Sequence, residues 1–464
     1  MNIYIHIENI IRELDGKLLV AILAASRGHQ VILSDIESLE KGLKKKILVP
    51  GIFHTKSLTP SEAKITRHQA IIENGSLISS MDEEGGLVEE GYERESKFRF
   101  SEQSIEQASV IFGWGQDDTE TLSRVYSKHS GKIYKTGSPR ADLWRSSFSD
   151  YWSISKSTPK RPFLLMISHM SHANYVIPFY NIIADARKGG KFKRDPMWFS
   201  KKFGMAAEHY LSTAAFIKAI EYFSKSNSDY DIVLRPHPNE SIQSWEVFLK
   251  DIPNVHIIRE GSVTPWVNRS FAVMHNGCTT GLEAVFSEKP LITYLPFEQE
   301  YANDFSIGLG YKVKTKEELL MKVNEFFNFS KTNSLKNLYD SSVDKNKVFK
   351  KIYFDENELS AKKIIKVWES LSATNEKLSR PNNWIKFKMF LTIIKLRGII
   401  GRLLKKIFPK NFSQVSYNKE NFKFPSLREK DILERVTRLQ HILGIKEKID
   451  CKILSEKTIL IKRS

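Results

Sequence analysis

The sequence predicts an α/β protein with two doubly wound domains, each built on a parallel sheet that helices cover on both faces. Three observations support this prediction. Apolar runs of about four to six residues alternate with segments of helical periodicity, a pattern typical of parallel sheets. The alternation occurs in two blocks, and a polar segment at residues 146–161 separates them. At about 100–200 residues per domain, 464 residues suffice for two or three domains. Each block is therefore interpreted as a Rossmann-like domain.

The first block covers residues 1–145 and begins with a short apolar run. Strands are expected at residues 3–7, 30–33, 46–49, 77–79, 109–114 and 132–136. A helix is expected over residues 14–27, where apolar side chains recur at helical spacing until Gly28 ends the pattern. The last strand leads into the turn Gly137-Ser138-Pro139, which closes the domain.

The second block covers residues 160–370 and repeats the alternation. Strands are expected at residues 163–167, 231–234, 255–258, 271–274 and 291–295, and helices at 209–224, 316–327 and 356–370. Residues 171–205 mix Gly-Gly, Pro and cations with little periodicity. We interpret them as a long connection or an insertion near a substrate cleft.

The overall composition excludes several classes of protein. With 41% hydrophobic and 27% charged residues, the chain is an ordinary globular protein and not a disordered one. Two cysteines are too few for a disulfide framework, which indicates a reducing cytosol. No apolar run approaches about 18 residues, and early acidic residues rule out a signal peptide, so no membrane-spanning or secretory segment is expected.

The net charge of +17 lies mostly at the C-terminus. Residues 371–464 hold 22 Lys and Arg against 8 Asp and Glu, a net of +14, which leaves +3 for the first 370 residues. This distribution argues against a uniformly basic surface for nucleic acid, which we do not expect as a partner. It predicts a separate, basic and partly helical extension at residues 371–464.

Residues 384–410 form the most basic part of this extension. They hold eight Lys and Arg and no acid, with Trp384, Phe387 and Phe390 near the start. The spacing predicts an amphipathic helix that lies on an anionic membrane surface. A helix packed on the protein body with a solvated charged face is the alternative. The expected apolar face comprises Met389, Ile393, Leu396, Ile400, Leu403 and Ile407, and the opposite face Lys388, Lys395, Arg402 and Lys406.

An acidic loop follows the expected strand at residues 77–79. Asp82, Glu83 and Glu84 stand in a row before two glycines. A carboxylate at the carboxyl end of a strand can approach a ligand as a general base, and repulsion within the row raises the pKa of at least one member. A solvated acidic turn is the alternative interpretation.

Two further loops favour anion binding. After the strand at 231–234, prolines on both sides fix the backbone of His237, which suits phosphate binding next to Arg235; a His that caps a turn is the alternative. After the strand at 271–274, a glycine-containing turn with Thr279 and Thr280 enters a helix. Backbone N–H groups and hydroxyls there can bind phosphate, whereas ordinary N-capping by threonine is the alternative. Glu260 follows the strand at 255–258 and is interpreted as a ribose ligand or a simple turn residue.

The order of these motifs across two Rossmann-like domains resembles a known group of enzymes. An acidic pair before Gly, then His-Pro, then a hydroxyl pair is similar to the bacterial surface-polysaccharide transferases of the GT-B fold. That group includes sialyl-, polysialyl- and Kdo-type capsule transferases and CDP-glycerol transferases. Two segments resemble a sub-family described as surface carbohydrate (capsule and lipopolysaccharide) biosynthesis proteins. They are the opening Glu8 with Arg12-Glu13-Leu14-Asp15-Gly16-Lys17-Leu18-Leu19, and Thr136-Gly137-Ser138-Pro139-Arg140.

The resemblance implies a glycosyltransferase with two domains facing a cleft. Glu83 would be the base that activates the acceptor, and His237 would contact the donor phosphate and assist leaving-group departure. Thr279 and Thr280 would bind the same phosphate in place of the usual serine pair, and Glu260 would hold the ribose. Asp82 and Glu84 remain alternatives for the base, and the expected donor site is completed by Arg235, Asn276, Gly277 and Glu283.

The implied reaction moves a sugar, expected to be an acidic ulosonic acid, from a CMP-activated donor to a glycan or lipid-linked hydroxyl. No bound metal or cofactor is expected, and the protein is expected in the cytoplasm, peripheral on the inner face of the plasma membrane. The alternatives are a CDP-glycerol or CDP-ribitol polyol-phosphate transferase, a nucleotide-sugar 2-epimerase and a non-catalytic, membrane-associated assembly scaffold.

Overall fold

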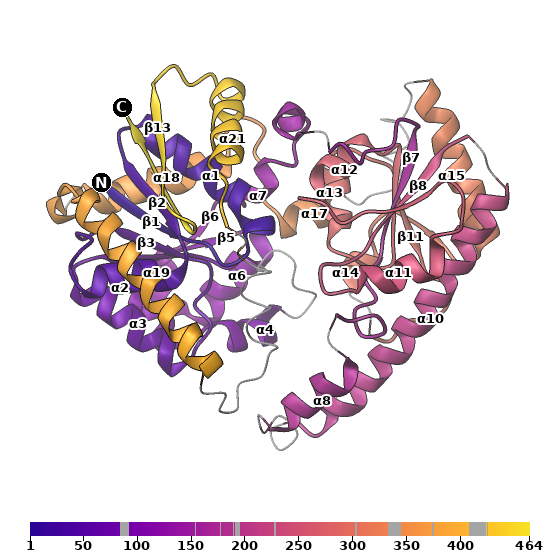
Figure 1. The fold of residues 1–464 in the computed structure, drawn as a ribbon, viewed down its shortest axis with the longest axis horizontal. Coiled ribbons are helices and arrows are strands. Elements are labelled where there is room, and N and C mark those ends of the chain that lie inside the picture. The colour runs from indigo at the N-terminus through magenta and orange to yellow at the C-terminus, as the bar shows by residue number, and fades with distance from the viewer. Residues whose placement is uncertain are drawn as a thin grey trace. The chain divides into compact units, whose positions relative to one another are not determined.

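The structure is a computed structural model of residues 1–464 in which two compact units are resolved (Figure 1). Unit 1 comprises Met1–Leu143 and Asn346–Ser464, and unit 2 comprises Trp144–Lys345. The described residues are all except 84–91, 154, 177, 189, 191–194, 227–228, 302–303, 333–344, 374, 408–423 and 425, and except the side chains of 94–95, 304, 345 and 401–407.

Unit 1 is built on an eight-stranded sheet in the order β13-β14-β2-β1-β3-β4-β5-β6. The strands from β1 to β6 pair in parallel, and only β14 and β13 add antiparallel at the β2 edge. The strands are β1 (Asn2–His6), β2 (Gln30–Ser34), β3 (Ile52–Thr55), β4 (Leu77–Met81), β5 (Ala108–Gly113), β6 (Ile133–Lys135), β13 (Ile449–Ser455) and β14 (Thr458–Arg463).

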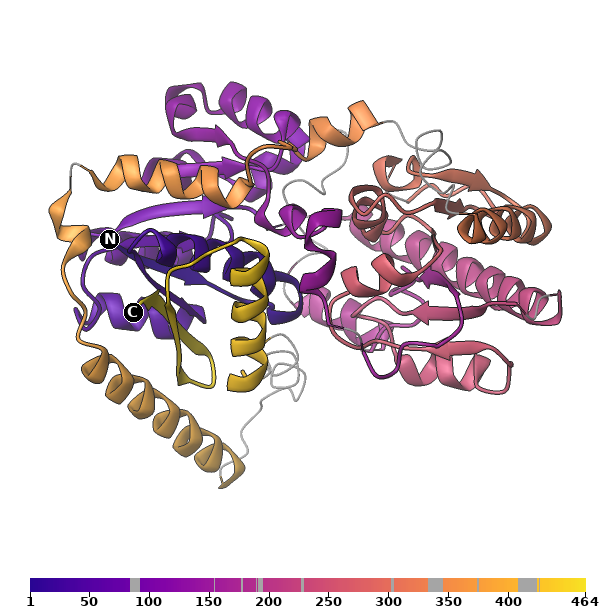
Figure 2. The ribbon, with the colours of Figure 1, turned by 90° about the horizontal axis from the view of Figure 1, so that it is seen from above.

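Helices cover both faces of this sheet, which confirms the doubly wound prediction. On one face, an apolar core forms between the sheet and α2, α3, α5 and α19. On the other, α1 packs against α7, α18 and α21 (Figure 2). The helices are α1 (Ile10–Ser26), α2 (Ile36–Lys44), α3 (Glu62–Glu73), α4 (Tyr92–Arg99), α5 (Glu102–Gln107), α6 (Gln116–Val125), α7 (Pro139–Asp142), α17 (Lys345–Lys351), α18 (Ser360–Ser372), α19 (Trp384–Ile407) and α21 (Glu429–Ile442).

Unit 2 contains a six-stranded parallel sheet in the order β12-β11-β10-β7-β8-β9. The sequence predicted five of its strands within one or two residues at each end. The strands are β7 (Phe163–Ile167), β8 (Asp231–Arg235), β9 (Val255–Ile257), β10 (Ala272–His275), β11 (Leu291–Tyr294) and β12 (Tyr311–Val313). The helices are α8 (Phe179–Lys188), α10 (Met197–Ser226), α11 (Ile242–Leu249), α12 (Thr264–Arg269), α13 (Thr280–Phe286), α14 (Asp304–Ile307) and α15 (Lys316–Lys331).

The predicted domain boundaries differ from the observed ones. Residues 346–370, assigned by sequence to the second domain, belong to unit 1, and so does the stretch 371–464 that was predicted to be a separate extension. The physical reason is burial: Trp368 and Phe387 are fully buried in unit 1, and β14 pairs with β2. The C-terminal stretch is therefore a structural part of the first domain.

One local prediction is wrong, and one of the two interpretations of a second segment is excluded. The strand predicted at residues 46–49 is a turn that follows α2, with a positive φ of 54° at Lys46, and the strand begins later, at Ile52. The segment 171–205, interpreted as a long connection or an insertion near a substrate cleft, contains α8 and the first turns of α10 among its described residues, so it is not an irregular connection. The exposed large apolar side chains in this segment, such as Tyr180 and Met197, obscure the helical period.

Candidate functional site

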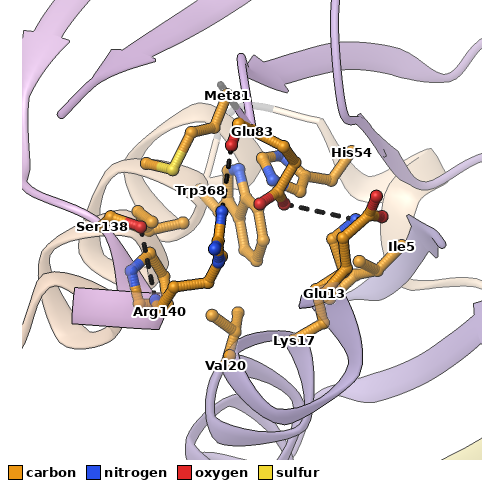
Figure 3. Close-up of a pocket in the computed structure, with 13 residues that line it drawn as sticks. Ile5, Glu13, Lys17, Val20, His54, Met81, Glu83, Ser138, Arg140 and Trp368 are labelled. Atoms are coloured by element: carbon orange, nitrogen blue, oxygen red, sulfur yellow. Dashed lines mark hydrogen bonds and ion pairs between the residues drawn. The ribbon is translucent and has the colours of Figure 1, made fainter. Parts of the chain in front are cut away.

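The acidic loop of unit 1 leaves β4 and places Glu83 in a small pocket of about 20 Å³ (Figure 3). Glu83 is buried, with its backbone N–H donating to the carbonyl of Lys56 at 3.1 Å. His54 and Trp368 form part of the wall and are joined through the Ser79 hydroxyl, which contacts His54 Nδ1 at 3.0 Å and accepts from Trp368 Nε1 at 2.8 Å.

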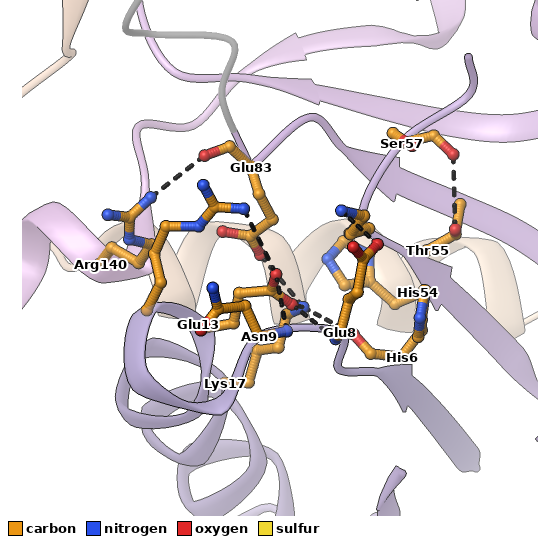
Figure 4. Close-up of polar contacts among 12 residues, drawn as sticks. His6, Glu8, Asn9, Glu13, Lys17, His54, Thr55, Ser57, Glu83 and Arg140 are labelled. Atoms are coloured by element: carbon orange, nitrogen blue, oxygen red, sulfur yellow. Dashed lines mark hydrogen bonds and ion pairs between the residues drawn. The ribbon is translucent and has the colours of Figure 1, made fainter. Parts of the chain in front are cut away.

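Lys17, which is buried, is the counter-ion of Glu83 (Figure 4). Its Nζ lies 3.3 Å from Glu83 Oε1 and 2.7 Å from Glu13 Oε2, and it donates to the carbonyl of His6 at 2.6 Å. Burial is the largest single influence on Lys17 and lowers its pKa, but the two carboxylates together raise it above the usual value. Burial also raises the pKa of Glu13, yet Lys17 and backbone N–H groups outweigh this and hold it at about 2.

The two segments that carry the sub-family resemblance meet at this pocket. Lys17 comes from α1, and Arg140 comes from α7, where its guanidinium donates to the carbonyl of Glu83 at 3.1 Å. Gly16 permits this approach, because a Cβ at that position would lie 3.1 Å from the Arg140 backbone. In the sequence, the two segments were linked only by their resemblance to the same sub-family. The structure brings them together around Glu83.

The other members of the acidic row have different environments. Asp82 binds Arg99 with both carboxylate oxygens, at 3.0 and 2.8 Å, and its carbonyl accepts from Trp114 Nε1 at 2.8 Å. Asp82 therefore anchors the loop, whereas Glu83 lines the pocket. Glu84 lies outside the described residues.

In unit 2, the loops after β7, β8 and β10 lie next to one another because these three strands are neighbours in the sheet. His237 follows β8, and its ring lies 5.1 Å from that of His169 after β7. The backbone N–H of His169 donates to Asn276 Oδ1, after β10, at 3.1 Å. Three strand ends thus contribute adjacent polar groups at one edge of the sheet, as the topology of the fold favours.

Three histidines that the sequence did not single out join His237. We call His169, His172, His209 and His237 the histidine cluster; successive rings lie 5.0–6.0 Å apart. Lys202 of α10 lies 3.2 Å from His172 Nε2. Burial first, and neighbouring cationic groups second, lower the pKa of His172 to about 4 and that of His209 to about 3. The imidazoles of His172 and His209 are therefore neutral at pH 7. A bound anion would favour their protonated form.

Glu240 fixes the geometry of this edge. Its buried carboxylate accepts hydrogen bonds from the Ser168 hydroxyl at 2.7 Å, the Met170 N–H at 2.7 Å and Trp245 Nε1 at 2.8 Å. The β7 loop is thereby tied to the end of the His237 loop. The sequence contained Glu240 in the motif after β8, but nothing in the motif indicated its partners.

The glycine-containing loop after β10 also has a defined geometry. Gly277 has a φ of 100°, which side chains rarely adopt, and His275 Nδ1 accepts from the Cys278 N–H at 3.1 Å. The alternative of N-capping is not seen, because Thr279 at the N-cap of α13 makes no side-chain cap hydrogen bond. Thr280 Oγ1 accepts a hydrogen bond from Cys278 Sγ at 3.3 Å.

Three predicted donor-site residues have structural partners. Arg235 is buried and donates to the carbonyls of Glu260 (2.9 Å) and Gly261, and burial lowers its pKa to about 10. The Glu260 carboxylate accepts from the hydroxyls of Ser155 and Ser157 at 2.5 and 2.7 Å. Glu283 accepts from the Thr264 hydroxyl at 2.7 Å. Glu260 nevertheless lines an open cavity of about 430 Å³, lined also by Ser157, Ile242, His256, Ile257, Ile258 and Arg259.

Within the described part of the chain, no three His, Cys, Asp or Glu side chains gather in a way that could hold a metal ion. The arrangement in unit 2 can instead bind an anion through imidazole, hydroxyl and ammonium donors. The arrangement in unit 1 holds one carboxylate, Glu83, against Lys17 in a pocket shielded from water, where proton transfer is feasible.

No protein-family model matches the chain, and no curated protein matches it. Similar solved structures include a putative UDP-N-acetylglucosamine 2-epimerase from Listeria monocytogenes, at a TM-score of 0.49 and 13% identity, covering 81% of this chain and 96% of that chain. A UDP complex of MnaA from S. aureus has a TM-score of 0.48 and 14% identity and covers 82% of this chain and 99% of the other. UDP-GlcNAc 2-epimerase from Neisseria meningitidis, bound to UDP-GlcNAc, has a TM-score of 0.46 and 12% identity, with 80% and 100% covered.

These likenesses fall below one half on the TM scale, so they assign neither an activity nor a ligand to this chain. The fold itself is confirmed by the two parallel α/β sheets described above. The resemblance to CMP-sugar and CDP-polyol transferases, drawn from the motifs, stays a prediction.

Proposed function

We propose that the protein is a glycosyltransferase that moves a sugar from a CMP-activated donor to a glycan or lipid-linked hydroxyl. The observation that carries the proposal is the histidine cluster at the carboxyl ends of β7 and β8, beside the loop after β10. The proposed hydrogen-bond donors for a phosphate are the four imidazoles, Lys202 and Thr279, whose hydroxyl makes no capping hydrogen bond. They lie at the strand ends where open α/β sheets bind their ligands.

On the donor side, His237 is the proposed acid, because the departure of CMP requires a group that can donate a hydrogen bond or a proton. The bond between the sugar carbon and the phosphate oxygen breaks, and its electron pair moves to that oxygen. His237 donates a hydrogen bond or a proton to the oxygen, while Thr279 and Thr280 donate to the other phosphate oxygens. A preorganised donor of this kind typically lowers the barrier by about 3–4 kcal/mol. Arg235 acts indirectly, because it holds the turn at Glu260.

On the acceptor side, Glu83 is the proposed base. The acceptor oxygen bonds to the sugar carbon, and its proton passes to the Glu83 carboxylate. The Lys17 ammonium, whose pKa is raised by its carboxylate neighbours, lies 3.3 Å from Glu83 Oε1 and holds the Glu83 carboxylate in place. Asp82 serves as an anchor in this scheme because Arg99 occupies both of its oxygens.

A nucleotide-sugar 2-epimerase is the second candidate. One observation favours it: the Glu83 pocket, at about 20 Å³, is too small for an acceptor sugar as it stands. An epimerase needs no acceptor, and the phosphate-binding edge of unit 2 would serve a UDP-sugar as well. The cavity beside Glu260, at about 430 Å³, is large enough for the nucleoside in either case.

Nucleotide binding separates these candidates. Thermal unfolding is followed with CMP, CDP, UMP, UDP and GDP, since a ligand at 100 times its Kd stabilises a protein by about 2.7 kcal/mol. Stabilisation by CMP that is lost in His237→Ala, and kept in the surface control His441→Ala, supports the transferase. Preference for UDP supports the epimerase, and preference for CDP supports a polyol-phosphate transferase. No response to any nucleotide contradicts all three and leaves the scaffold.

The base assignment has its own test in a transfer assay with the donor that binds. Glu83→Gln keeps the shape of the side chain and removes the base, so the rate should fall by a factor of about 10²–10⁴. Asp82→Asn should retain most of the rate. Nucleotide binding should be unchanged in both variants, and an unimpaired Glu83→Gln enzyme would refute the assignment. The scheme assigns the leaving-group charge to protein groups and requires no metal, so the rate should persist with EDTA.

A further inference from the structure

The basic helix α19 has two apolar faces, and among the residues that the structure describes only the inner face packs against the rest of unit 1. Phe387, Phe390 and Leu391 point inward and belong to the core that unit 1 forms with α2. A Cβ on Gly42 of α2 would lie only 3.1 Å from the ring of Phe387, which shows how closely the two helices pack. This inner, aromatic face fixes α19 along the edge of unit 1 (Figure 2).

The second apolar face consists of aliphatic side chains and is exposed. Its members recur at spacings of four, four, three and four residues, which places them on one line along the helix. We call this set the outer stripe; Ile385, Met389, Ile393, Leu396 and Ile400 are 76%, 63%, 48%, 53% and 55% exposed. It includes most of the face that the sequence predicted, and the side chains of Leu403 and Ile407 lie outside the described residues.

Cations border the outer stripe on both sides. At 100° per residue, Lys386 and Arg397 lie on one flank, and Lys388 and Lys395 on the other. Lys395 pairs with Glu456 at 2.5 Å, whereas no ion pair within the described part of the chain is recorded for the other three. The helix has no acid.

This charge pattern differs from that of other surface helices in the same protein. Helix α15 balances its lysines with Glu317, Glu318 and Glu325, and α21 carries Glu429, Asp431 and Glu434 beside its basic residues. A helix that needed only water on its outer face would gain nothing from five exposed aliphatic side chains.

We propose that the outer stripe of α19 lies on a membrane surface with anionic lipids. The aliphatic side chains enter the boundary between headgroups and acyl chains, and the flanking cations meet the anionic headgroups. A second copy of the chain is a poorer partner, because a two-fold contact through this face would bring the cationic flanks of both copies together. Among the described helices, none is long and apolar enough to cross a bilayer.

The proposal goes beyond the proposed function and does not depend on it. It implies that α19 holds unit 1 at an anionic lipid surface.

The test is sedimentation of the full-length protein with vesicles of phosphatidylcholine, with or without phosphatidylglycerol. Point variants are needed, because removal of residues 371–464 would also remove part of the unit 1 core. Lys388→Gln with Arg397→Gln should weaken binding to anionic vesicles about twenty-five-fold, since one cation contributes about fivefold. The matched control, Lys430→Gln with Lys446→Gln, removes the same charge from exposed positions elsewhere in unit 1 and should change binding only slightly.

The stripe is tested by Ile393→Asn with Leu396→Asn, which should weaken binding at least about tenfold. Its control, Val247→Asn with Met321→Asn, alters apolar side chains that are similarly exposed in unit 2. Equal binding of both stripe and control variants would overturn the proposal. So would binding that ignores phosphatidylglycerol, or a dimer in solution that the stripe variant abolishes.

Discussion

Replacing Lys17 by methionine should destabilise unit 1 strongly at neutral pH. The substitution keeps the aliphatic stem but removes the ammonium that lies 2.7 Å from Glu13 and 3.3 Å from Glu83, and both carboxylates are buried. Removing one partner of a buried ion pair typically costs about 3–5 kcal/mol. The lowered pKa of Glu13 leads to a similar figure: a decrease from 4.5 to about 2 corresponds to about 3 kcal/mol of stability.

The destabilisation caused by Lys17→Met should depend on pH in a defined direction. In the wild type, the pKa of Glu13 is lower in the folded state than in the unfolded state, so this stability is present above about pH 4.5 and is lost as the pH falls towards 2. Without Lys17, burial of the Glu13 carboxyl is no longer outweighed by the ammonium, so protonation of Glu13 relieves the destabilisation. The difference between wild type and variant should therefore shrink as the pH is lowered.

Urea unfolding followed by tryptophan fluorescence measures this difference at several pH values. The matched control is Lys41→Met, which breaks the exposed pair of Lys41 and Glu37 and should cost no more than about 0.5 kcal/mol. The reasoning would be refuted if Lys17→Met were no less stable than Lys41→Met at neutral pH. It would also be refuted if the stability difference between wild type and Lys17→Met grew as the pH was lowered.

Two further predictions concern other parts of the molecule. The affinity for a nucleotide phosphate should rise as the pH falls from about 7 to about 5.5, because binding favours protonation of imidazoles that are neutral in the free protein. Calorimetry in buffers of different ionisation enthalpy should show proton uptake, and His172→Asn with His209→Asn should flatten the dependence. Gly137→Ala should lower stability by about 1–3 kcal/mol, because φ is 80° and the new Cβ would lie 2.6 Å from a backbone carbonyl oxygen. Gly131→Ala, with nothing within 4 Å of its Cβ, should be close to neutral in the same thermal unfolding assay.

The sequence predicted most strands of the two sheets because buried parallel strands are short apolar runs, but it misplaced β3 and did not predict β12 or β13. It also placed Glu83, His237 and Thr279 correctly at strand ends, since a strand end is a local feature. What it could not predict were contacts between distant segments. The pairing of β14 with β2 joins residues more than 400 positions apart, and no local pattern indicates such a partner.

The sequence predicted only part of each candidate site for the same reason. Lys17 lies four residues after Glu13 in α1, so the helical spacing indicates that pair, but nothing local indicates that Glu83 is its second partner. His169 follows the strand expected at 163–167 and His209 begins the helix expected at 209–224, and no local pattern indicated that their rings meet. For Arg235 and Glu260, residue type and position suggested ligand binding, whereas the structure shows protein partners for both side chains.

The antiparallel hairpin of β13 and β14 has a consequence for how the chain folds during synthesis. Unit 2 is one continuous segment, Trp144–Lys345, so all of its strands have left the ribosome before β14 has been made. Unit 1 cannot close the β2 edge of its sheet until Thr458–Arg463 emerges. The second domain is therefore expected to fold first, while the edge of β2 stays open to wrong pairing for the longest time. Slower synthesis of the last residues would lengthen this exposure and should lower the yield of folded protein.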